Sequence, residues 1–214
     1  MHKNKVIIMD KKEIRKEIIK ARKNMSQDEW QEKSGQILSK LTGLSCYKRA
    51  KRILVYCSYN NEADTNGIIK ESLNLGKEVY VPKVIADDNN DIKYGVMFFY
   101  RINDTAQLTE GYMGIPEPDV TVCKKIVHHD EKSDSHSDKQ LNDTEELIIC
   151  PLVAFDEHCN RIGYGGGFYD RYLAKHNLKS VGIAFELQKI NEVQSCINDV
   201  ALDVIVTDGN IYYK

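Results

Sequence analysis

A glycine-rich turn at residues 161–170 has the clearest chemical character in the chain. It reads Arg-Ile-Gly-Tyr-Gly-Gly-Gly-Phe-Tyr-Asp, and its glycines are Gly163, Gly165, Gly166 and Gly167. Glycine adopts positive φ easily and lets a ligand approach the backbone without a Cβ in the way. Successive N–H groups in such a turn, with the amino end of a following helix, can surround phosphate oxygens. Arg161 could add a forked, permanently charged contact to the same phosphates.

This turn matches neither common nucleotide motif. The chain has no G-x-x-x-x-G-K-[ST] pattern, and the Rossmann spacing fails because residue 168 is Phe. Glycine-rich turns without a binding role are common, so the turn alone leaves phosphate binding and a plain structural turn both open.

Asp170 stands where the helix after the turn is expected to begin. A carboxylate there would repel a polyphosphate unless a cation lay between them, and Mg²⁺ binds one or two carboxylates together with substrate phosphates. The alternative is an acid that only stabilises the helix dipole. The residue itself leaves both interpretations open.

A basic stripe lies on the first predicted helix. It consists of Lys11, Arg15 and Arg22, and it runs beside an apolar stripe formed by Ile14, Ile18, Ala21 and Met25. Charges that border a buried stripe tend to lie at the rim of a cleft, whereas the simpler interpretation is a solvated helix face.

Strand and helix patterns alternate along most of the chain. Helices are predicted to begin after the N-caps Asp10, Ser26 and Thr65, the first two with capping boxes completed by Glu13 and Glu29, and a further helix spans 168–175. Strands are predicted at 52–58, 78–82, 96–102, 147–152, 180–185 and 203–207, with a candidate edge strand at 211–213. This order predicts a single three-layer α/β domain over 1–214, with a mainly parallel sheet and helices on both faces. Ligands of such sheets bind at the carboxyl ends of the strands.

Residues 123–146 interrupt this pattern, because they hold few apolar residues among many polar ones. We predict a disordered insertion within the domain. His128, His129 and His136 could bind a metal weakly, but their spacing fits no structural zinc site, and a solvated loop is favoured.

Composition limits the kinds of partner. The chain has 214 residues, a formal net charge of −2 and six cysteines without a C-x-x-C pair. We therefore expect neither nucleic acid nor a membrane as a partner, and we expect no zinc ribbon or redox motif. The apolar run at 6–9 is too short for a signal peptide, which favours a cytoplasmic protein.

The glycine-rich turn also carries a family resemblance. The string from Arg161 to Tyr172 closely resembles the C-terminal motif of the 5-formyltetrahydrofolate cyclo-ligases, also called methenyltetrahydrofolate synthetases. Five further segments match in the same order: Lys11 to Lys16, Arg52 to Thr65, Val81 to Lys83, Gly114 to Pro118 and Leu202 to Asp208.

The resemblance implies an activity. Family members use ATP to convert 5-formyltetrahydrofolate into 5,10-methenyltetrahydrofolate, with ADP and phosphate as the other products. The γ-phosphoryl group is transferred to the formyl oxygen, N10 attacks the activated carbon, and phosphate leaves. The implied cofactor is Mg²⁺, the co-substrate is ATP, and we expect a monomer that takes the folate with or without a polyglutamate tail.

It also implies roles for residues, carried over by position. The implied ATP contacts are Lys11, Arg15, Arg161, Gly163, Gly165, Gly166, Gly167 and Tyr169, and the implied folate contacts are Cys57, Glu62, Tyr164, Gly165, Gly166, Gly167 and Phe168. The implied catalytic residues are Arg161, Tyr169 and Asp170, and the implied metal ligands are Asp170 and Asp199. A carboxylate at Glu62 can accept two parallel hydrogen bonds from the amino-pyrimidine edge of the pterin.

One departure motivates an alternative. Ile197 stands where the family usually has an acid that contributes to magnesium binding. The alternative is therefore a folate- or nucleotide-binding protein of the same fold with weakened or lost turnover. A second rival is an enzyme of the sugar-phosphate isomerase or CoA-transferase type, against which the turn with Asp170, Lys11 and Arg15 argues.

Overall fold

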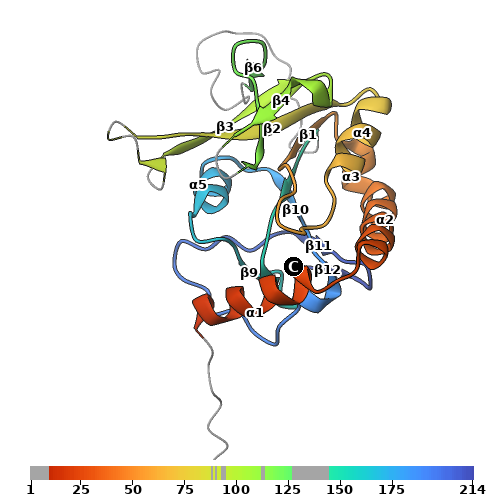
Figure 1. The fold of residues 1–214 in the computed structure, drawn as a ribbon, viewed down its shortest axis with the longest axis vertical. Coiled ribbons are helices and arrows are strands. Elements are labelled where there is room, and N and C mark those ends of the chain that lie inside the picture. The colour runs from red at the N-terminus through yellow and green to blue at the C-terminus, as the bar shows by residue number, and fades with distance from the viewer. Residues whose placement is uncertain (1–9, 88, 90, 93–94, 112–113, 127–144) are drawn as a thin grey trace, which may run out of the picture.

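An eight-stranded sheet forms the centre of the molecule (Figure 1). The computed structural model describes residues 10–87, 89, 91–92, 95–111, 114–126 and 145–214. In spatial order the strands of the sheet are β12 (Ile211–Tyr213), β11 (Val204–Val206), β10 (Lys179–Ile183), β7 (Glu146–Cys150), β1 (Arg52–Val55), β2 (Glu78–Ile85), β3 (Val96–Ile102) and β6 (Lys124–Lys125). The five strands from β11 to β2 are parallel, and β12, β3 and β6 are antiparallel to their neighbours.

The remaining elements surround this sheet. The helices are α1 (Lys11–Lys23), α2 (Gln27–Gly43), α3 (Ser45–Arg49), α4 (Asn66–Asn74) and α5 (Phe168–Lys175), with short 3₁₀ turns at Thr105–Gln107 and Glu186–Gln188. Two small antiparallel pairs join β4 (Leu108–Glu110) to β5 (Pro116–Pro118) and β8 (Ala154–Phe155) to β9 (Arg161–Ile162). No helix in the described part of the chain has the length and apolar character needed to cross a bilayer.

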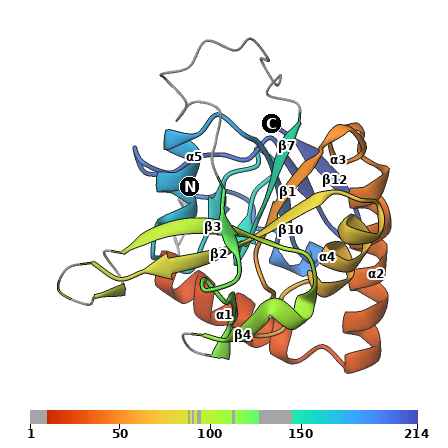
Figure 2. The same ribbon diagram turned by 90° about the horizontal axis from the view of Figure 1, so that it is seen from above.

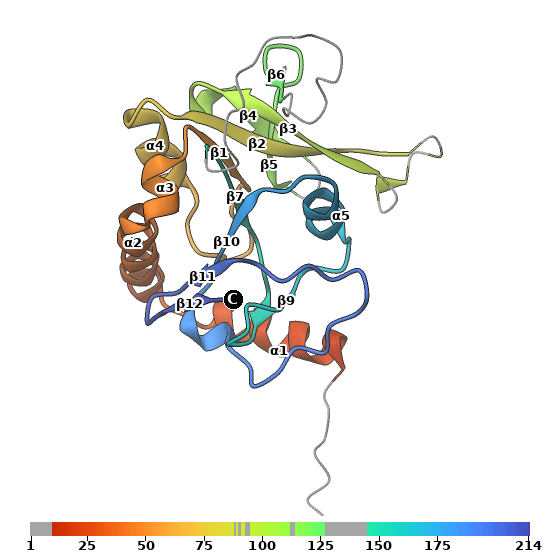
Figure 3. The same cartoon turned by 180° about the vertical axis from the view of Figure 1, so that it is seen from behind.

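Both faces of the sheet are buried, as the predicted three-layer architecture requires. In β1, Ile53 and Val55 belong to the core on the side of α2 and α4, whereas Leu54 belongs to the core on the side of α5. The two views in Figures 1 and 3 show α2, α3 and α4 on one side of the sheet and α5 on the other. A parallel strand covered on both faces must be apolar at successive positions, which accounts for the continuous run of β1.

Helix α1 lies apart from these two layers. It lies beside β9 (Figure 3), and its apolar residues Ile14 and Ile18 pack against Ala154 and Ile162 of the small β8–β9 pair. This packing brings the first helix of the chain beside the segment that enters the glycine-rich turn.

The hairpin of β2 and β3 reaches past the rest of the sheet (Figure 2). Its register pairs Val79 with Ile102 near the body and Ile85 with Val96 near the tip. The strand predicted at 78–82 extends to Ile85 in the structure. Its antiparallel pairing with β3 continues beyond the residues that are buried in the core.

The three predicted N-cap residues directly precede α1, α2 and α4, but Asp10 and Thr65 do not form the expected side-chain caps. Asp10 makes no side-chain cap of α1, and the hydroxyl of Thr65 accepts a hydrogen bond from the N–H of Ser58 instead of capping α4. Asp64 caps α4, because its carboxylate accepts hydrogen bonds from the N–H groups of residues 66 and 67 at 3.0 and 3.1 Å. At α2 the prediction is confirmed in part, since Ser26 accepts from the N–H of Glu29.

The predicted disordered insertion at 123–146 is wrong at both of its ends. Lys124–Lys125 form β6 against β3, with Cys123 and Ile126 buried on either side of that strand. Glu146 begins β7. The rest of the predicted insertion, including its three histidines, lies outside the described residues.

Gly182 in β10 lies where the surrounding core has no space for a larger side chain. A Cβ at Gly182 would lie 2.7 Å from a methyl carbon of Leu152 and of Leu202. Gly182→Ala should lower the free energy of unfolding by about 1–3 kcal/mol through overpacking. Urea denaturation measures it, with Gly35→Ala as the control, because that helical glycine has no atom within 4 Å of an added Cβ. The control should be neutral or stabilising, and equal losses in both variants would contradict the prediction.

Candidate active site

The glycine-rich turn runs from β9 to the amino end of α5. Gly165 and Gly167 have φ of +103° and +65°, so both adopt the left-handed conformations that favour glycine. Gly167 is the N-cap of α5, and the helix spans the predicted residues. The turn therefore has the backbone shape and the following helix that anion binding needs.

The first helix supplies one cation to this turn and a second to the segment at Asp199. The Nε of Arg15 donates a 2.7 Å hydrogen bond to the carbonyl oxygen of Gly163, and its guanidinium lies against Gly165. Lys11 forms a 2.7 Å ion pair with Asp199. The structure thus brings Arg15 to the turn and Lys11 to Asp199, partners that lie 148 and 188 residues away along the chain.

Arg161 and Asp170 form a partly buried ion pair across the turn. The Nη2 of Arg161 lies 2.8 Å from Oδ1 of Asp170, and its Nη1 donates to the carbonyl oxygen of Val200. The N–H of Val200 donates to the same Oδ1 at 3.1 Å. The guanidinium is buried, so its fork holds the turn, α5 and the segment at Val200 together as well as carrying charge.

Asp199 is held as a carboxylate. Partial burial opposes its ionisation, but the hydrogen bonds from Lys11 and from the N–H of Cys196 outweigh that effect and lower its pKa. Both hydrogen bonds go to Oδ2, the second at 2.9 Å. Among the described residues, no hydrogen bond reaches Oδ1 of Asp199 or Oδ2 of Asp170, so each carboxylate keeps one oxygen for another ligand.

Two carboxylates suit only some metal ions. The described residues contain no group of three or more His, Cys, Asp and Glu side chains that could hold a metal alone. Mg²⁺ needs no such cage, because it keeps several waters and completes its shell with substrate phosphates. Ile197 adds nothing to the donor set, because its hydrocarbon side chain has no oxygen, nitrogen or sulfur atom. The pair of Asp170 and Asp199 therefore fits magnesium better than a structural zinc ion.

Glu62 lies beside the turn as a buried carboxylate. It follows β1, and its Oε1 accepts a 2.7 Å hydrogen bond from the hydroxyl of Tyr164, a residue of the glycine-rich turn. Its Oε2 accepts from the N–H of Tyr59 at 2.8 Å. Burial raises the pKa of Glu62, although both hydrogen bonds and the nearby Arg22 act in the opposite direction.

Apolar and aromatic groups line the neighbourhood of Glu62. Cys57 is buried, and burial raises the pKa of its thiol to about 12, so it is neutral and fits the apolar role expected of it. Burial also raises the pKa of Tyr169 well above its usual value, and its hydroxyl has no hydrogen-bond partner among the described residues. Phe168 lies at the start of α5 and partly lines a cavity of about 190 Å³ between that helix and β3.

The sequence pattern predicted the wrong environment for the side chain of Arg22. The basic stripe predicted a cleft rim, yet this guanidinium has no exposed surface and donates to Tyr164 at 2.8 Å. Its spacing of seven residues from Arg15 puts it on the same helix face, and this is the signal that could have assigned it to the site.

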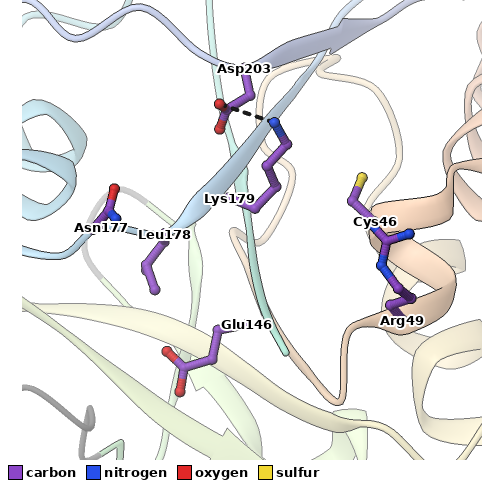
Figure 4. A pocket seen from close by; sticks show the side chains of 7 residues that line it. All are labelled: Cys46, Arg49, Glu146, Asn177, Leu178, Lys179 and Asp203. Carbon is purple, nitrogen blue, oxygen red and sulfur yellow. Dashed lines mark ion pairs between the residues drawn. The ribbon is translucent and has the colours of Figure 1, made fainter. Parts of the chain in front are cut away.

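Another cavity, of about 220 Å³, lies at the opposite end of the sheet (Figure 4). Its lining includes Glu146, Lys179 and Asp203, at the amino ends of β7, β10 and β11, and Lys179 pairs with Asp203 at 3.1 Å. None of the predicted site residues lies there, which agrees with ligand binding at the carboxyl ends of the strands.

Fold and site together define an α/β protein whose glycine-rich turn lies close to cations, to acidic side chains and to one buried glutamate. The chain belongs to the 5-formyltetrahydrofolate cyclo-ligase family, whose model matches residues 7–208. A cyclo-ligase of Haemophilus influenzae is 30% identical over 92% of this chain and 97% of its own length. The Escherichia coli enzyme is 27% identical over 89% and 96%. The solved structure of Aquifex aeolicus 5,10-methenyltetrahydrofolate synthetase aligns with a TM-score of 0.75 and 29% identity, covering 96% of this chain and 93% of that one.

The pair of Arg161 and Asp170 should contribute to stability more than the pair of Lys11 and Asp199. Asp170→Asn keeps the shape but removes the charge facing a buried guanidinium, so the free energy of unfolding should fall by about 1–3 kcal/mol. Lys11→Met should cost less than about 1 kcal/mol, because that pair is partly solvated. Urea denaturation compares the two, and an equal or larger loss for Lys11→Met would contradict this ranking.

Proposed function

We propose that this protein catalyses the ATP-dependent conversion of 5-formyltetrahydrofolate into 5,10-methenyltetrahydrofolate, with release of ADP and phosphate. One observation carries the proposal. In a chain of the cyclo-ligase family, a glycine-rich turn with nearby cations lies beside the buried carboxylate of Glu62, and the hydroxyl of Tyr164 hydrogen-bonds the two together. The proposal includes a cytoplasmic monomer that needs neither nucleic acid nor a membrane and takes the folate with or without a polyglutamate tail.

The reaction sets two physical tasks. An amide-like formyl oxygen is a poor leaving group until it is phosphorylated, and ring closure becomes fast only when N10 is held close to the activated carbon. The protein therefore has to position two substrates against each other and neutralise the charge of the transferring phosphoryl group.

The glycine-rich turn is suited to the triphosphate. We propose that its backbone N–H groups at 163–167 and the amino end of α5 donate to phosphate oxygens, while Lys11, Arg15 and Arg161 supply positive charge. The Nε of Arg15 is engaged by Gly163, which fixes the guanidinium against the turn and orients its remaining N–H groups. Arg161, which pairs with Asp170, is proposed to share its charge with an incoming phosphate.

We assign the magnesium ligands to Asp170 and Asp199. When bound, Mg²⁺ neutralises phosphate charge and orients the γ-phosphoryl group for transfer. Asp170 remains fixed by Arg161 and Val200 through one oxygen. Asp199 is expected to exchange its contact with Lys11, which frees that ammonium for the phosphates.

The folate is proposed to lie against Glu62. Each oxygen of this carboxylate already accepts one hydrogen bond and keeps capacity for a second, so it can receive the two parallel donors of the pterin edge. Cys57 and Phe168 offer apolar contacts, as do the small residues Gly165, Gly166 and Gly167 that leave room beside Tyr164. The hydroxyl of Tyr169, which has no hydrogen-bond partner among the described residues, is proposed to contact a substrate oxygen.

The alternative function is folate or nucleotide binding without turnover, which Ile197 favours. An absorbance assay with 5-formyltetrahydrofolate, ATP and Mg²⁺ separates the two. We expect the methenyl product to form, and omission of Mg²⁺ should lower the rate by about two orders of magnitude or more, since charge neutralisation of this kind supplies several kcal/mol. Folate binding without product would establish the alternative, and a rate independent of Mg²⁺ would remove the assigned role of Asp170 and Asp199.

Arg15→Ala should weaken ATP and leave the folate largely unaffected. Losing a charge-assisted contact to phosphate should raise the KM for ATP about tenfold or more. The matched control is Lys16→Ala, which removes an exposed positive charge from the next position of α1. Steady-state kinetics with each substrate varied in turn measures the effect, and equal KM values for ATP in the two variants would exclude Arg15 from the site.

A further inference from the structure

Arg22 is a completely buried arginine in the last turn of α1. Its Nη2 donates to the hydroxyl of Tyr164 at 2.8 Å and to the carbonyl oxygen of Asn60 at 3.2 Å. One nitrogen therefore joins the first helix to the glycine-rich turn and to the segment between β1 and α4. The guanidinium also lies 5.9 Å from the centre of the Tyr164 ring.

The segment that Arg22 contacts is the one that presents Glu62. Asn60 and Asn61 both adopt left-handed backbone conformations, with φ of 53° and 56°. Such conformations are unfavourable for residues other than glycine, and asparagine tolerates them better than most. The hydrogen bond to the Asn60 carbonyl thus supports a turn whose shape determines where the Glu62 carboxylate lies.

The burial of this cation is costly for stability. The Nε and Nη1 atoms of Arg22 are buried and have no hydrogen-bond partner among the described residues. Unpaired donors and a desolvated charge both oppose folding, and apolar residues often replace buried charges without loss of stability. A role in stability alone therefore gives a poor account of an arginine at this position.

We propose that Arg22 is a positioning residue for the folate half of the site, which clamps the turn at Asn60 to Tyr164 and keeps Glu62 oriented for the pterin. This inference rests on the proposed function, in which Glu62 receives the pterin edge. Arg22 acts through Tyr164 and the turn, and it makes no direct hydrogen bond to the Glu62 carboxylate among the contacts of the described residues.

The charges around Glu62 fix the sign of the expected pH effect. Burial raises its pKa, and the opposing influences are the Tyr164 hydroxyl, the Tyr59 N–H and the charge of Arg22. The other titratable groups that act electrostatically with Glu62 are the hydroxyls of Tyr56 and Tyr169, which burial keeps neutral. Arg22 is therefore the only cation among these groups, and its removal should raise the pKa of Glu62 further.

The test compares Arg22→Met with Lys23→Met in the full chain. Both remove one positive charge from the last turn of α1, but Lys23 is exposed. Arg22→Met should raise the KM for 5-formyltetrahydrofolate about 10- to 100-fold, the range expected for a lost hydrogen bond to a charged group, and leave the KM for ATP within about twofold. The control should match the wild type for both substrates.

The pH profile distinguishes a positioning role of Arg22 from a merely structural one, because a structural role would leave the profile unchanged. Folate binding needs ionised Glu62, so kcat/KM for the folate falls as the pH drops through the pKa of that group. In Arg22→Met this fall should begin at a higher pH than in the wild type. Arg22→Lys keeps the charge and loses the fork, so its profile should stay near that of the wild type while its KM lies between the two.

Glu62→Gln separates the failure of this inference from the failure of the proposed function. If Glu62→Gln leaves the KM for the folate unchanged, the folate role of Glu62 is wrong. If that variant is impaired while Arg22→Met behaves as Lys23→Met in KM and pH profile, Arg22 has no positioning role. Thermal unfolding checks each variant, and if Arg22→Met does not fold, a wild-type KM for the folate in Arg22→Lys overturns the clamp.

Discussion

The docking of α1 onto the β8–β9 pair is the constraint on which the rest of the site depends. Ile14 and Ile18 bury apolar surface against Ala154 and Ile162, and the same helix then carries Arg15 to the turn. This apolar contact supports the polar contacts that hold Arg15 and Arg22, from the beginning of the chain, against a turn near its end. The hydrophobic packing is non-directional, so the hydrogen bond from Arg15 to Gly163 supplies the register.

Once α1 is docked, the two halves of the site differ in how they handle charge. Around the turn, Asp170 and Asp199 are each paired with a cation, and each keeps one oxygen that accepts no hydrogen bond from the described residues. Around Glu62, burial dominates and the carboxylate depends on a tyrosine hydroxyl, a backbone N–H and a more distant cation. The first arrangement suits exchange of partners with phosphates and a metal ion, and the second suits recognition of a neutral, planar donor edge.

The sequence was most informative where structure is local. The helix after the glycine-rich turn spans the predicted residues. The signals that define it, which are Gly167, the spacing of its apolar residues and Lys175, all lie within one short segment. Contacts between distant segments were not predictable in the same way. The pairing of Arg161 with the Val200 carbonyl joins residues 39 apart, and no periodicity encodes it. Asp10 shows a different kind of error. A residue type that allows a side-chain cap at the start of a helix does not require that side chain to accept the hydrogen bond.

The structure changes how much the departure at Ile197 should matter for metal binding. Its side chain is 99% exposed, so replacing an acid there removes a solvated charge and leaves the core unchanged. Asp199 lies two residues further on, is fixed by the N–H of Cys196, and has its pKa lowered mainly by Lys11 and that N–H against partial burial. A carboxylate that stays ionised and immobile binds a cation at less entropic cost than a mobile one. Metal binding at this site then depends less on the missing acid than on how readily Lys11 leaves Asp199 for the phosphates.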